Sequence, residues 1–417
     1  MTQLQVPYGS THIDLDIDAD LLEISEGGGT RRAAIEPTTV IREALWNPLG
    51  TKRLREIVAS KKDPNIVIVV DDQTRDTPTE LMLDVVSEEL GKEYSNQITL
   101  LVACGTHEPP TSGDLKRILG KHYRKFTLVI HECDAKDLVY VGTTSKGTPV
   151  RLNKTYLNAN IRVLTGDITL HYYAGFGGGR KSILPGISAR DTTKKNHALL
   201  VDEHARTANI DCNPVHEDMT EAASFAPPDF VLNVVEAGKG NIVAAFAGDI
   251  NAVFQDGIEV AHNLFRLETR TLFDILVVSA GGFPKDRNLY QASKAIENCY
   301  RAVAPGGELI LVAECCEGIG DPYFEAWMDD FATYEETEAA IRFNFVLGGH
   351  KAYYLRKVMT KIGLSIVSDL HTETLSRWQI KAFNSLTEIL DGVKKDKCRI
   401  GIVKNGLDIL LVPASNI

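Results

Sequence analysis

Residues 66–78 have the sequence Ile66-Val-Ile-Val-Val-Asp-Asp-Gln-Thr-Arg-Asp-Thr-Pro78, in which five apolar residues are followed at once by charged and polar ones. The apolar run predicts a buried strand, and the apolar spacing from Pro78 to Leu90 predicts a helix. The same order then returns, with a strand expected at 98–103, a loop, and a helix at 111–119. This alternation indicates an α/β fold with a mostly parallel sheet covered on both faces.

The rest of the chain continues the alternation in two blocks. The polar stretch Glu268-Thr-Arg-Thr271 separates a helix expected at 252–267 from a new strand at 273–278. With 417 residues the chain is longer than a single core usually supports. We therefore expect two α/β domains, residues 1–268 and 269–417, with the active site in the cleft between them. Other strands are expected at 127–130, 138–141, 161–164, 308–313, 364–367 and 399–403, a hairpin at 230–246, and helices at 288–303, 351–362 and 374–390.

The overall composition excludes several classes of function. A net charge of −11 argues against nucleic acid or an anionic membrane as a general partner, because no excess of basic residues is available to neutralise phosphates. No apolar stretch approaches the ~18 residues of a membrane span, and the first residues do not resemble a signal peptide, so we expect a cytoplasmic protein. The seven cysteines include no Cys-x-x-Cys pair. Metal chemistry would therefore depend on histidine.

A glycine-rich block follows the strand expected at 161–164. It has the sequence His171-Tyr-Tyr-Ala-Gly-Phe-Gly-Gly-Gly-Arg-Lys-Ser-Ile-Leu-Pro-Gly186, with four glycines between positions 175 and 179. Such a loop can bring backbone N–H groups close to an anion. The neighbouring charge of Arg180 should lower the pKa of Lys181 and make its amine nucleophilic. Because Arg180 stands where both the Walker loop and the dinucleotide fingerprint need glycine, neither motif is present.

Polar side chains follow several predicted strands at the point where each strand ends. Asp72 and Arg75, His107, His171 and the pair Gly281–Gly282 all have this position. In open α/β sheets this edge is where ligands bind. Two histidines beside one small substrate could take and return a proton on opposite faces of one carbon, which inversion of a stereocentre requires.

His197 lies in a helix-like segment after the glycine-rich block, where packing does not require an imidazole. Because neutral imidazole suits nickel, zinc or copper, His197 is a candidate metal ligand.

Taken together, the block 171–186, the segments 72–75, 105–107 and 196–197, and the segment 281–294 resemble the nickel-dependent lactate racemase family. The resemblance implies a nickel-pincer nucleotide, pyridinium-3-thioamide-5-thiocarboxylic acid mononucleotide nickel, tethered covalently to Lys181. It also implies that His197 is the protein ligand to nickel. His107 and His171 match the two acid/base groups of a racemase or epimerase that inverts Cα of a 2-hydroxy acid by reversible hydride transfer to the cofactor.

The resemblance implies further partners and contacts. Separate maturation proteins would load the cofactor, and the substrate would be a small 2-hydroxy acid. Positions 291 and 294 are neighbours on one face near the start of a helix, whose N-terminus favours an anion. The implied cofactor contacts are Asp72, Thr74, Arg75, Gly177, Gly178, Arg180, Lys181 and Ser182, and the implied substrate contacts are Arg75, Tyr290, Gln291 and Lys294.

Two departures from the family pattern concern the substrate. Gln73 stands in place of a histidine, and the segment 348–353 has no tryptophan but contains His350 and Lys351. Additional polar groups favour a larger or more anionic 2-hydroxy acid, such as malate or a sugar acid. Two other functions stay open at this point: a nucleotide-dependent transferase, and a non-catalytic nickel- or nucleotide-binding protein.

Overall fold

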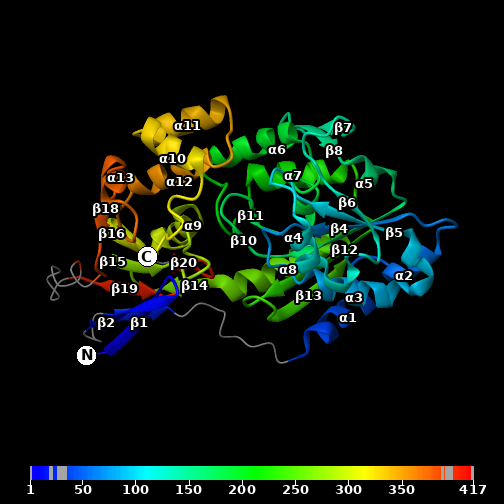
Figure 1. The fold of residues 1–417 in the computed structure, drawn as a ribbon, viewed down its shortest axis with the longest axis horizontal. Helices are drawn as coiled ribbons and strands as arrows, with labels where there is room; N and C mark the ends of the chain where they lie inside the picture. Colours follow the sequence, from blue (N-terminus) through cyan, green and yellow to red (C-terminus); the bar gives the residue numbers. More distant parts are fainter. Residues whose placement is uncertain (1, 18–21, 26–34, 387–388, 390–397, 415–417) are drawn as a thin grey trace. The chain divides into compact units, whose positions relative to one another are not determined.

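The computed structural model describes residues 2–17, 22–25, 35–386, 389 and 398–414 (Figure 1). The chain forms two compact units: a larger unit, residues 31–264, and a smaller unit, residues 1–30 together with 265–417. The expected first domain therefore needs correction at its start, because the N-terminal segment belongs with the second half of the chain. In the described parts of the chain, no helix is both long and apolar enough to cross a membrane.

The larger unit is built on a six-stranded sheet of order β13-β12-β9-β4-β5-β6. Every neighbouring pair is parallel except β12 and β13, which form an antiparallel hairpin. From β4 the chain adds β5 and β6 on one side and later β9 and β12 on the other, so the strand order reverses between β4 and β9. Ligands bind at such a point in open α/β sheets. The strands are β4 (Ile66–Asp71), β5 (Ile98–Ala103), β6 (Thr127–Ile130), β9 (Ile161–Asp167), β12 (Phe230–Glu236) and β13 (Ile242–Gly248).

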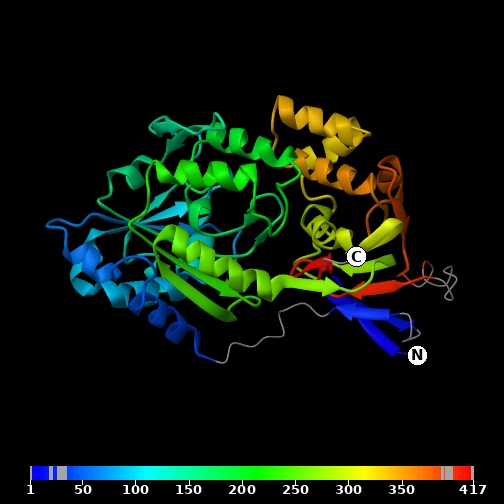
Figure 2. The same cartoon turned by 180° about the vertical axis from the view of Figure 1, so that it is seen from behind.

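Helices cover both faces of this sheet, as the unbroken apolar strands predict. One face packs against α1, α2, α3 and α4 in a core that includes Ile68, Leu100 and Val163. On the other side lie α6 and α7 (Figures 1 and 2). The helices are α1 (Pro37–Trp46), α2 (Leu54–Ala59), α3 (Thr79–Leu90), α4 (Ser112–Leu119), α5 (Lys154–Asn158), α6 (Arg190–His197), α7 (Pro214–Ser224) and α8 (Ile250–Phe265), and a hairpin joins β7 (Val139–Thr143) to β8 (Pro149–Leu152).

The smaller unit has a second six-stranded sheet, of order β18-β17-β16-β15-β19-β3, in which all neighbours are parallel. One face packs against α9, α10, α12 and α13. The hairpin of β1 and β2 covers the other face, where Leu4, Val6 and Leu15 join the core. The elements are β1 (Thr2–Tyr8), β2 (Thr11–Ile17), β3 (Leu22–Ser25), β15 (Phe273–Ser279), α9 (Leu289–Cys299), β16 (Val303–Val312), α10 (Pro322–Asp330), α11 (Tyr334–Phe343), α12 (Gly349–Met359), β17 (Gly363–Val367), α13 (Thr372–Arg377), β18 (Lys381–Phe383) and β19 (Ile400–Val403).

One expectation about the second half of the chain was incomplete. The helix expected at 374–390 is the short helix α13 followed by the edge strand β18, while residues 387–388 and 390 lie outside the described part. The last strand, β20 (Leu410–Pro413), pairs in parallel with β14 (Arg266–Thr269) at the start of the smaller unit.

Candidate active site

The candidate site lies where the order of the first sheet reverses. Asp71 ends β4 and Asp72 follows it, while Asp167 ends β9. His107 follows β5 in a turn closed by a hydrogen bond from its N–H to the carbonyl of Cys104 at 2.9 Å. Because β4 lies between β5 and β9 in the sheet, the carboxyl ends of these strands bring the polar residues together. The larger unit holds all the site residues expected from the first half of the sequence: Asp72, Thr74, Arg75, His107, His171, Gly177, Gly178, Arg180, Lys181, Ser182 and His197.

Asp72 and His107 form a carboxylate–imidazole pair. Asp72 is 3% exposed, and its Oδ2 accepts a hydrogen bond from His107 Nδ1 at 2.7 Å. Its other oxygen accepts from the backbone N–H and the hydroxyl of Thr74 at 3.0 and 2.6 Å. Burial alone would raise the pKa of Asp72, but the hydrogen bonds from His107 and Thr74 hold it below its ordinary value. With the proton on Nδ1, His107 presents the lone pair of Nε2, the form of a general base.

His171 has the opposite tautomer. It ends the short strand β10 (Leu170–His171), which pairs with β11 (Gly175–Phe176), and its Nδ1 accepts a hydrogen bond from the N–H of Ala174 at 3.2 Å. A neutral His171 therefore carries its proton on Nε2. Burial and the charges of Lys181 and Arg75 lower the pKa of His171 well below its ordinary value. Because its imidazole is neutral at pH 7, His171 offers an N–H donor where His107 offers an acceptor.

The glycines of the loop mainly permit close backbone packing. The N–H of Gly177 donates to the carbonyl of Thr169 at 2.7 Å, and that of Gly179 donates to Asn233 Oδ1 at 2.9 Å. Gly178 has φ of +78°, a conformation that favours glycine. Since the N–H groups of Gly177 and Gly179 are already paired within the protein, the expected cradle for an anion is not formed by these two groups.

Arg180 braces the loop from within the protein. Its guanidinium is 2% exposed, donates from Nη2 to the carbonyls of Ala174 and Phe176 at 3.0 and 3.4 Å, and lies 4.1 Å from the ring centroid of Phe254. Burial lowers the pKa of Arg180 to about 9. Nη2 of Arg180 thus holds loop carbonyls, and its charge acts on Lys181. Contact of Arg180 with the cofactor stays a prediction.

Lys181 lies in a short 3-10 turn, η5 (Gly179–Ser182), that packs against β4 and β9. Burial, with the charges of Arg75 and Arg180, lowers the pKa of Lys181 well below its ordinary value, while Asp167 and Asp71 partly oppose this shift. Desolvation and like charges are how proteins make a lysine amine nucleophilic near neutral pH. Ser182, 5% exposed, belongs to the same turn.

A pair of carboxyl groups beside Lys181 was not expected from the sequence. The hydroxyl of Thr77 lies 2.7 Å from Asp71 Oδ2 and 3.2 Å from Asp167 Oδ1. Burial and the proximity of Asp167 raise the pKa of Asp71 to about 7, and burial raises that of Asp167. The signal in the sequence was the position of both residues at the ends of apolar runs, but only the sheet order shows that these ends are adjacent.

His197 has the form of a metal ligand. It ends α6, is 4% exposed, and donates from Nδ1 to Asn196 Oδ1 at 3.0 Å, so that Nε2 carries no proton. Burial and the charges of Lys181 and His107 lower the pKa of His197 to about 3, which keeps the imidazole neutral. Within the described residues, no group of three or more His, Cys, Asp or Glu side chains could hold a metal ion. His197 Nε2 could supply one ligand to a metal whose other ligands come from a bound group.

The residues expected to contact the substrate from the second half of the chain lie together in the smaller unit. Asn288 caps α9, and Lys294 Nζ donates to Gln291 Oε1 at 2.6 Å. Lys351 Nζ lies 5.5 Å from the ring centroid of Tyr290 and the Lys351 residue is 2% exposed. Burial and the charge of Lys294 lower the pKa of Lys351 to about 7. This cluster thus contains a second amine besides Lys294.

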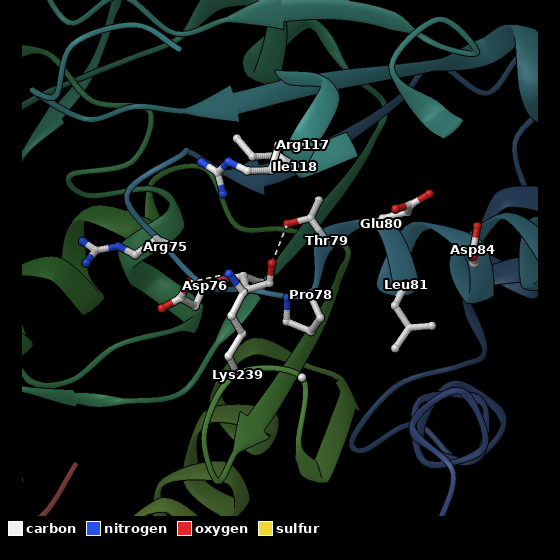
Figure 3. Close-up of a pocket in the computed structure, with 12 residues that line it drawn as sticks. Arg75, Asp76, Pro78, Thr79, Glu80, Leu81, Asp84, Arg117, Ile118 and Lys239 are labelled. Carbon is white, nitrogen blue, oxygen red and sulfur yellow. Dashed lines mark hydrogen bonds and ion pairs between the residues drawn. The ribbon is translucent and has the colours of Figure 1, made fainter. Parts of the chain in front are cut away.

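A pocket of about 430 Å³ opens beside Arg75 at the start of α3 (Figure 3). The ion pair between Asp76 and Lys239, at 3.5 Å, forms part of its wall, and Arg117 lies on another side. Of the expected site residues only Arg75 lines this pocket. The pocket therefore does not include His107 or His171.

Comparison with known proteins gives consistent matches over both halves of the chain. Residues 8–208 match the family model of the lactate racemase N-terminal domain, and residues 269–411 match that of the lactate racemase C-terminal domain. Lactate racemase of Thermoanaerobacterium thermosaccharolyticum is 28% identical over 99% of both chains, and that of Lactiplantibacillus plantarum is 31% identical over 78% of this chain and 77% of its own. The apoprotein structure of the former matches with a TM-score of 0.89, covering 98% of this chain and 100% of that one.

Proposed function

Because the chain belongs to the lactate racemase family, we propose that it is an isomerase that inverts Cα of a 2-hydroxy acid. The observation that carries this proposal is a pair of histidines whose Nδ1 atoms face opposite kinds of partner, a carboxylate and a backbone N–H, beside a lysine of lowered pKa. One imidazole is ready to accept a proton and the other to donate a hydrogen bond. A substrate oxygen that changes between hydroxyl and carbonyl needs both kinds of group.

In the tautomers described above, His107 Nε2 takes the hydroxyl proton of the substrate, and Asp72 stabilises the imidazolium that forms. His171 Nε2–H donates a hydrogen bond to the same oxygen as it becomes a carbonyl. The proton returns from His107 when the hydroxyl is restored. For the opposite enantiomer the roles exchange and His171 takes the hydroxyl proton. This requires its own proton to move from Nε2 to Nδ1 and the hydrogen bond from Ala174 to break.

Arg75 and the pair Gln291 and Lys294 are proposed to bind the substrate carboxylate and orient Cα. The guanidinium of Arg75 suits a carboxylate because its N–H donors form a planar fork. In the smaller unit, the hydrogen bond from Lys294 to Gln291 holds the Lys294 ammonium in place at the start of α9.

Lys181 and His197 are the residues that would hold the nickel-pincer nucleotide, Lys181 through a covalent bond and His197 through Nε2 as nickel ligand. When bound, the cofactor supplies a reversible acceptor for the hydrogen of Cα. Asp72, Thr74, Arg75, Gly178 and Ser182 remain proposed contacts of its nucleotide part. Loading of the cofactor would require separate maturation proteins.

The proposal is tested with protein produced together with such maturation proteins. We expect intact mass to show an adduct on Lys181, and His107→Gln and His171→Gln each to abolish racemisation while retaining that adduct. His204→Gln serves as control because His204 is a partly exposed histidine of the same unit, paired with Asp202 at 3.2 Å. Normal racemisation by both site variants would remove the assigned acid/base roles. An adduct without any exchange of Cα deuterium would instead indicate a carrier.

We further propose that the substrate is larger or more anionic than lactate. Lys351, beside Tyr290 and Lys294, adds a buried amine to the residues expected to bind substrate. Buried polar groups discriminate strongly against substrates that cannot pair with them. Racemisation of a panel of 2-hydroxy acids should therefore favour those with a second carboxylate or further hydroxyl groups. Lactate as the best substrate would reject this assignment.

A further inference from the structure

A chain of buried hydrogen bonds continues from His197 into the protein. His197 Nδ1 donates to Asn196 Oδ1 at 3.0 Å, and Asn196 Nδ2 donates to Asp218 Oδ2 at 2.9 Å. Asn196 and Asp218 are both 0% exposed. This relay of hydrogen bonds, from His197 through Asn196 to Asp218, connects the end of α6 to α7. The two helices lie side by side in the larger unit (Figures 1 and 2).

The orientation of the Asn196 amide follows from its surroundings. Its Nδ2 lies 2.9 Å from Asp218 Oδ2 and 3.2 Å from the carbonyl of Val215, and a carbonyl can only accept. The NH2 group must therefore point toward Asp218, and the amide oxygen must point toward His197. Since an amide oxygen cannot donate, the proton between the two residues belongs to His197 Nδ1.

Asp218 is itself held in place by the loop between β7 and β8. Thr144 Oγ1 donates to its Oδ1 at 2.5 Å, and Thr148 Oγ1 donates to its Oδ2 at 2.8 Å. Thr144 and Thr148 are 4% and 0% exposed. With Asn196, three donors converge on one buried carboxyl group. A fully satisfied buried network of this kind specifies one arrangement of its members.

We propose that Asp218 and Asn196 are positioning residues that hold His197 in the tautomer with the proton on Nδ1, so that Nε2 can bind a metal. The metal-ligand role of His197 comes from the proposed function, but the tautomer itself does not depend on it. Second partners of metal-binding histidines commonly fix the tautomer in this way, and their loss costs roughly 10- to 100-fold in metal affinity.

The first test uses the protein without cofactor and measures the ring-nitrogen signals of ¹⁵N-labelled histidine by NMR, with His197 assigned by its absence in His197→Gln. We expect Nδ1–H in the wild type. Asn196→Leu removes both the acceptor for His197 and the donor to Asp218, and free imidazole side chains favour Nε2–H. The signal should therefore shift to the other tautomer. An unchanged tautomer in Asn196→Leu would overturn the proposal.

A milder variant and a matched control accompany this measurement. In Asp218→Asn the new amide can present N–H instead of oxygen to Asn196, so we expect both tautomers of His197 in one sample. The control is Thr192→Val, which removes a buried hydroxyl bonded to the carbonyl of Pro149 at 2.6 Å on the same helix. The control should keep Nδ1–H. If the His197 signal shifted equally in the control, a general loss of packing of α6, and not the relay, would determine the tautomer.

The second readout is the rate at which cofactor-loaded protein loses nickel to EDTA. We expect the Asn196 and Asp218 variants to lose nickel roughly 10- to 100-fold faster than the wild type and the Thr192 control. A tautomer change in protein that never takes up nickel would support the relay and reject the proposed function. Normal nickel retention with an unchanged tautomer would reject the relay and leave the proposed function standing.

Discussion

The proposed acid/base histidines differ in what faces their Nδ1 atoms. A carboxylate oxygen of Asp72 faces Nδ1 of His107, whereas the backbone N–H of Ala174 faces Nδ1 of His171. One neighbour can only accept and the other can only donate, so each fixes a different tautomer. Single hydrogen-bond partners thus determine which imidazole is a base in the resting protein.

Replacing Asp72 by Asn should separate the effect of the His107 tautomer on catalysis from a loss of protein stability. The amide can present N–H to His107 Nδ1, which would move the proton to Nε2 and remove the base. We expect kcat of the loaded enzyme to fall by roughly 10²–10⁴, the scale of general-base catalysis, with little change in the free energy of unfolding. Steady-state kinetics and urea unfolding measure the two quantities. The exposed Asp63→Asn variant, which lies outside the site, should keep the kcat of the wild type.

The carboxyl pair of Asp71 and Asp167 predicts a pH dependence of stability. Because the pKa of Asp71 is raised to about 7 in the folded protein, its stabilising contribution is complete below about pH 4 and is lost as the pH rises through about 7. Asp71→Asn is neutral throughout, so its free energy of unfolding should rise relative to the wild type between these pH values. Urea unfolding at several pH values measures the difference. The exposed Asp63→Asn should show no such trend, and a flat difference for Asp71→Asn would contradict the assignment.

At the residue scale, the sequence pointed to a side chain where a strand end or a family motif marked it, and the roles given to those side chains stay predictions. His107, Lys181 and His197 were expected on those grounds. The roles of Asn196 and Asp218 could not be predicted, because their partners are close in space and the bonds depend on how α6 and α7 pack. The same is true of Arg180, whose carbonyl partners only the folded loop defines.

At the scale of elements, the strands were the best-predicted part of the fold. The strands expected at 98–103 and 127–130 have those bounds in the structure, because a buried strand of a parallel sheet is an unbroken apolar run between polar ends. The segment 374–390 was harder, since its apolar spacing suits a helix. Its middle instead forms the edge strand β18, where pairing with β17 prevails over local preference.

The glycine loop provides an element-level prediction. Gly175 has φ of +76°, and a Cβ there would lie 2.4 Å from the carbonyl oxygen of Asn209, whereas Gly147 has φ of +83° with open space around it. Gly147→Ala should cost about 1 kcal/mol of unfolding free energy through backbone strain alone. Gly175→Ala should cost more, by about 1–3 kcal/mol, because the backbone at Asn209 must also move to make room for the Cβ. Urea unfolding of both variants measures this, and equal losses would mean that packing of the loop is unimportant.

At the scale of the whole molecule, the least predictable feature was the place of the N-terminal segment. Nothing in its local sequence states that β3 pairs with β19, more than 370 residues later in the chain. Its apolar alternation predicts a strand with one buried face, but not which sheet receives that face. The proposed domain boundary near residue 268 followed from a polar stretch, which is a local signal.

Val6→Ala tests this division of the chain. Val6 is 0% exposed and belongs to the core under the second sheet, together with Val277, Ile310 and Ile402. Removing two buried methyl groups should cost about 1–3 kcal/mol. We expect hydrogen exchange measured by mass spectrometry to accelerate in peptides from β15 and β16, although these lie far along the chain, while β4 and β5 stay protected.

The reciprocal variant is Val58→Ala, at a 0% exposed valine of α2 in the core of the first sheet. Both substitutions remove the same atoms from an equally buried site, so their costs are comparable. Val58→Ala should accelerate exchange in β4 and β5 and leave β15 and β16 protected. If either substitution accelerated exchange equally in both sheets, the two units would unfold as one cooperative body. The assignment of the N-terminal hairpin to the smaller unit would then have no counterpart in the stability of that unit.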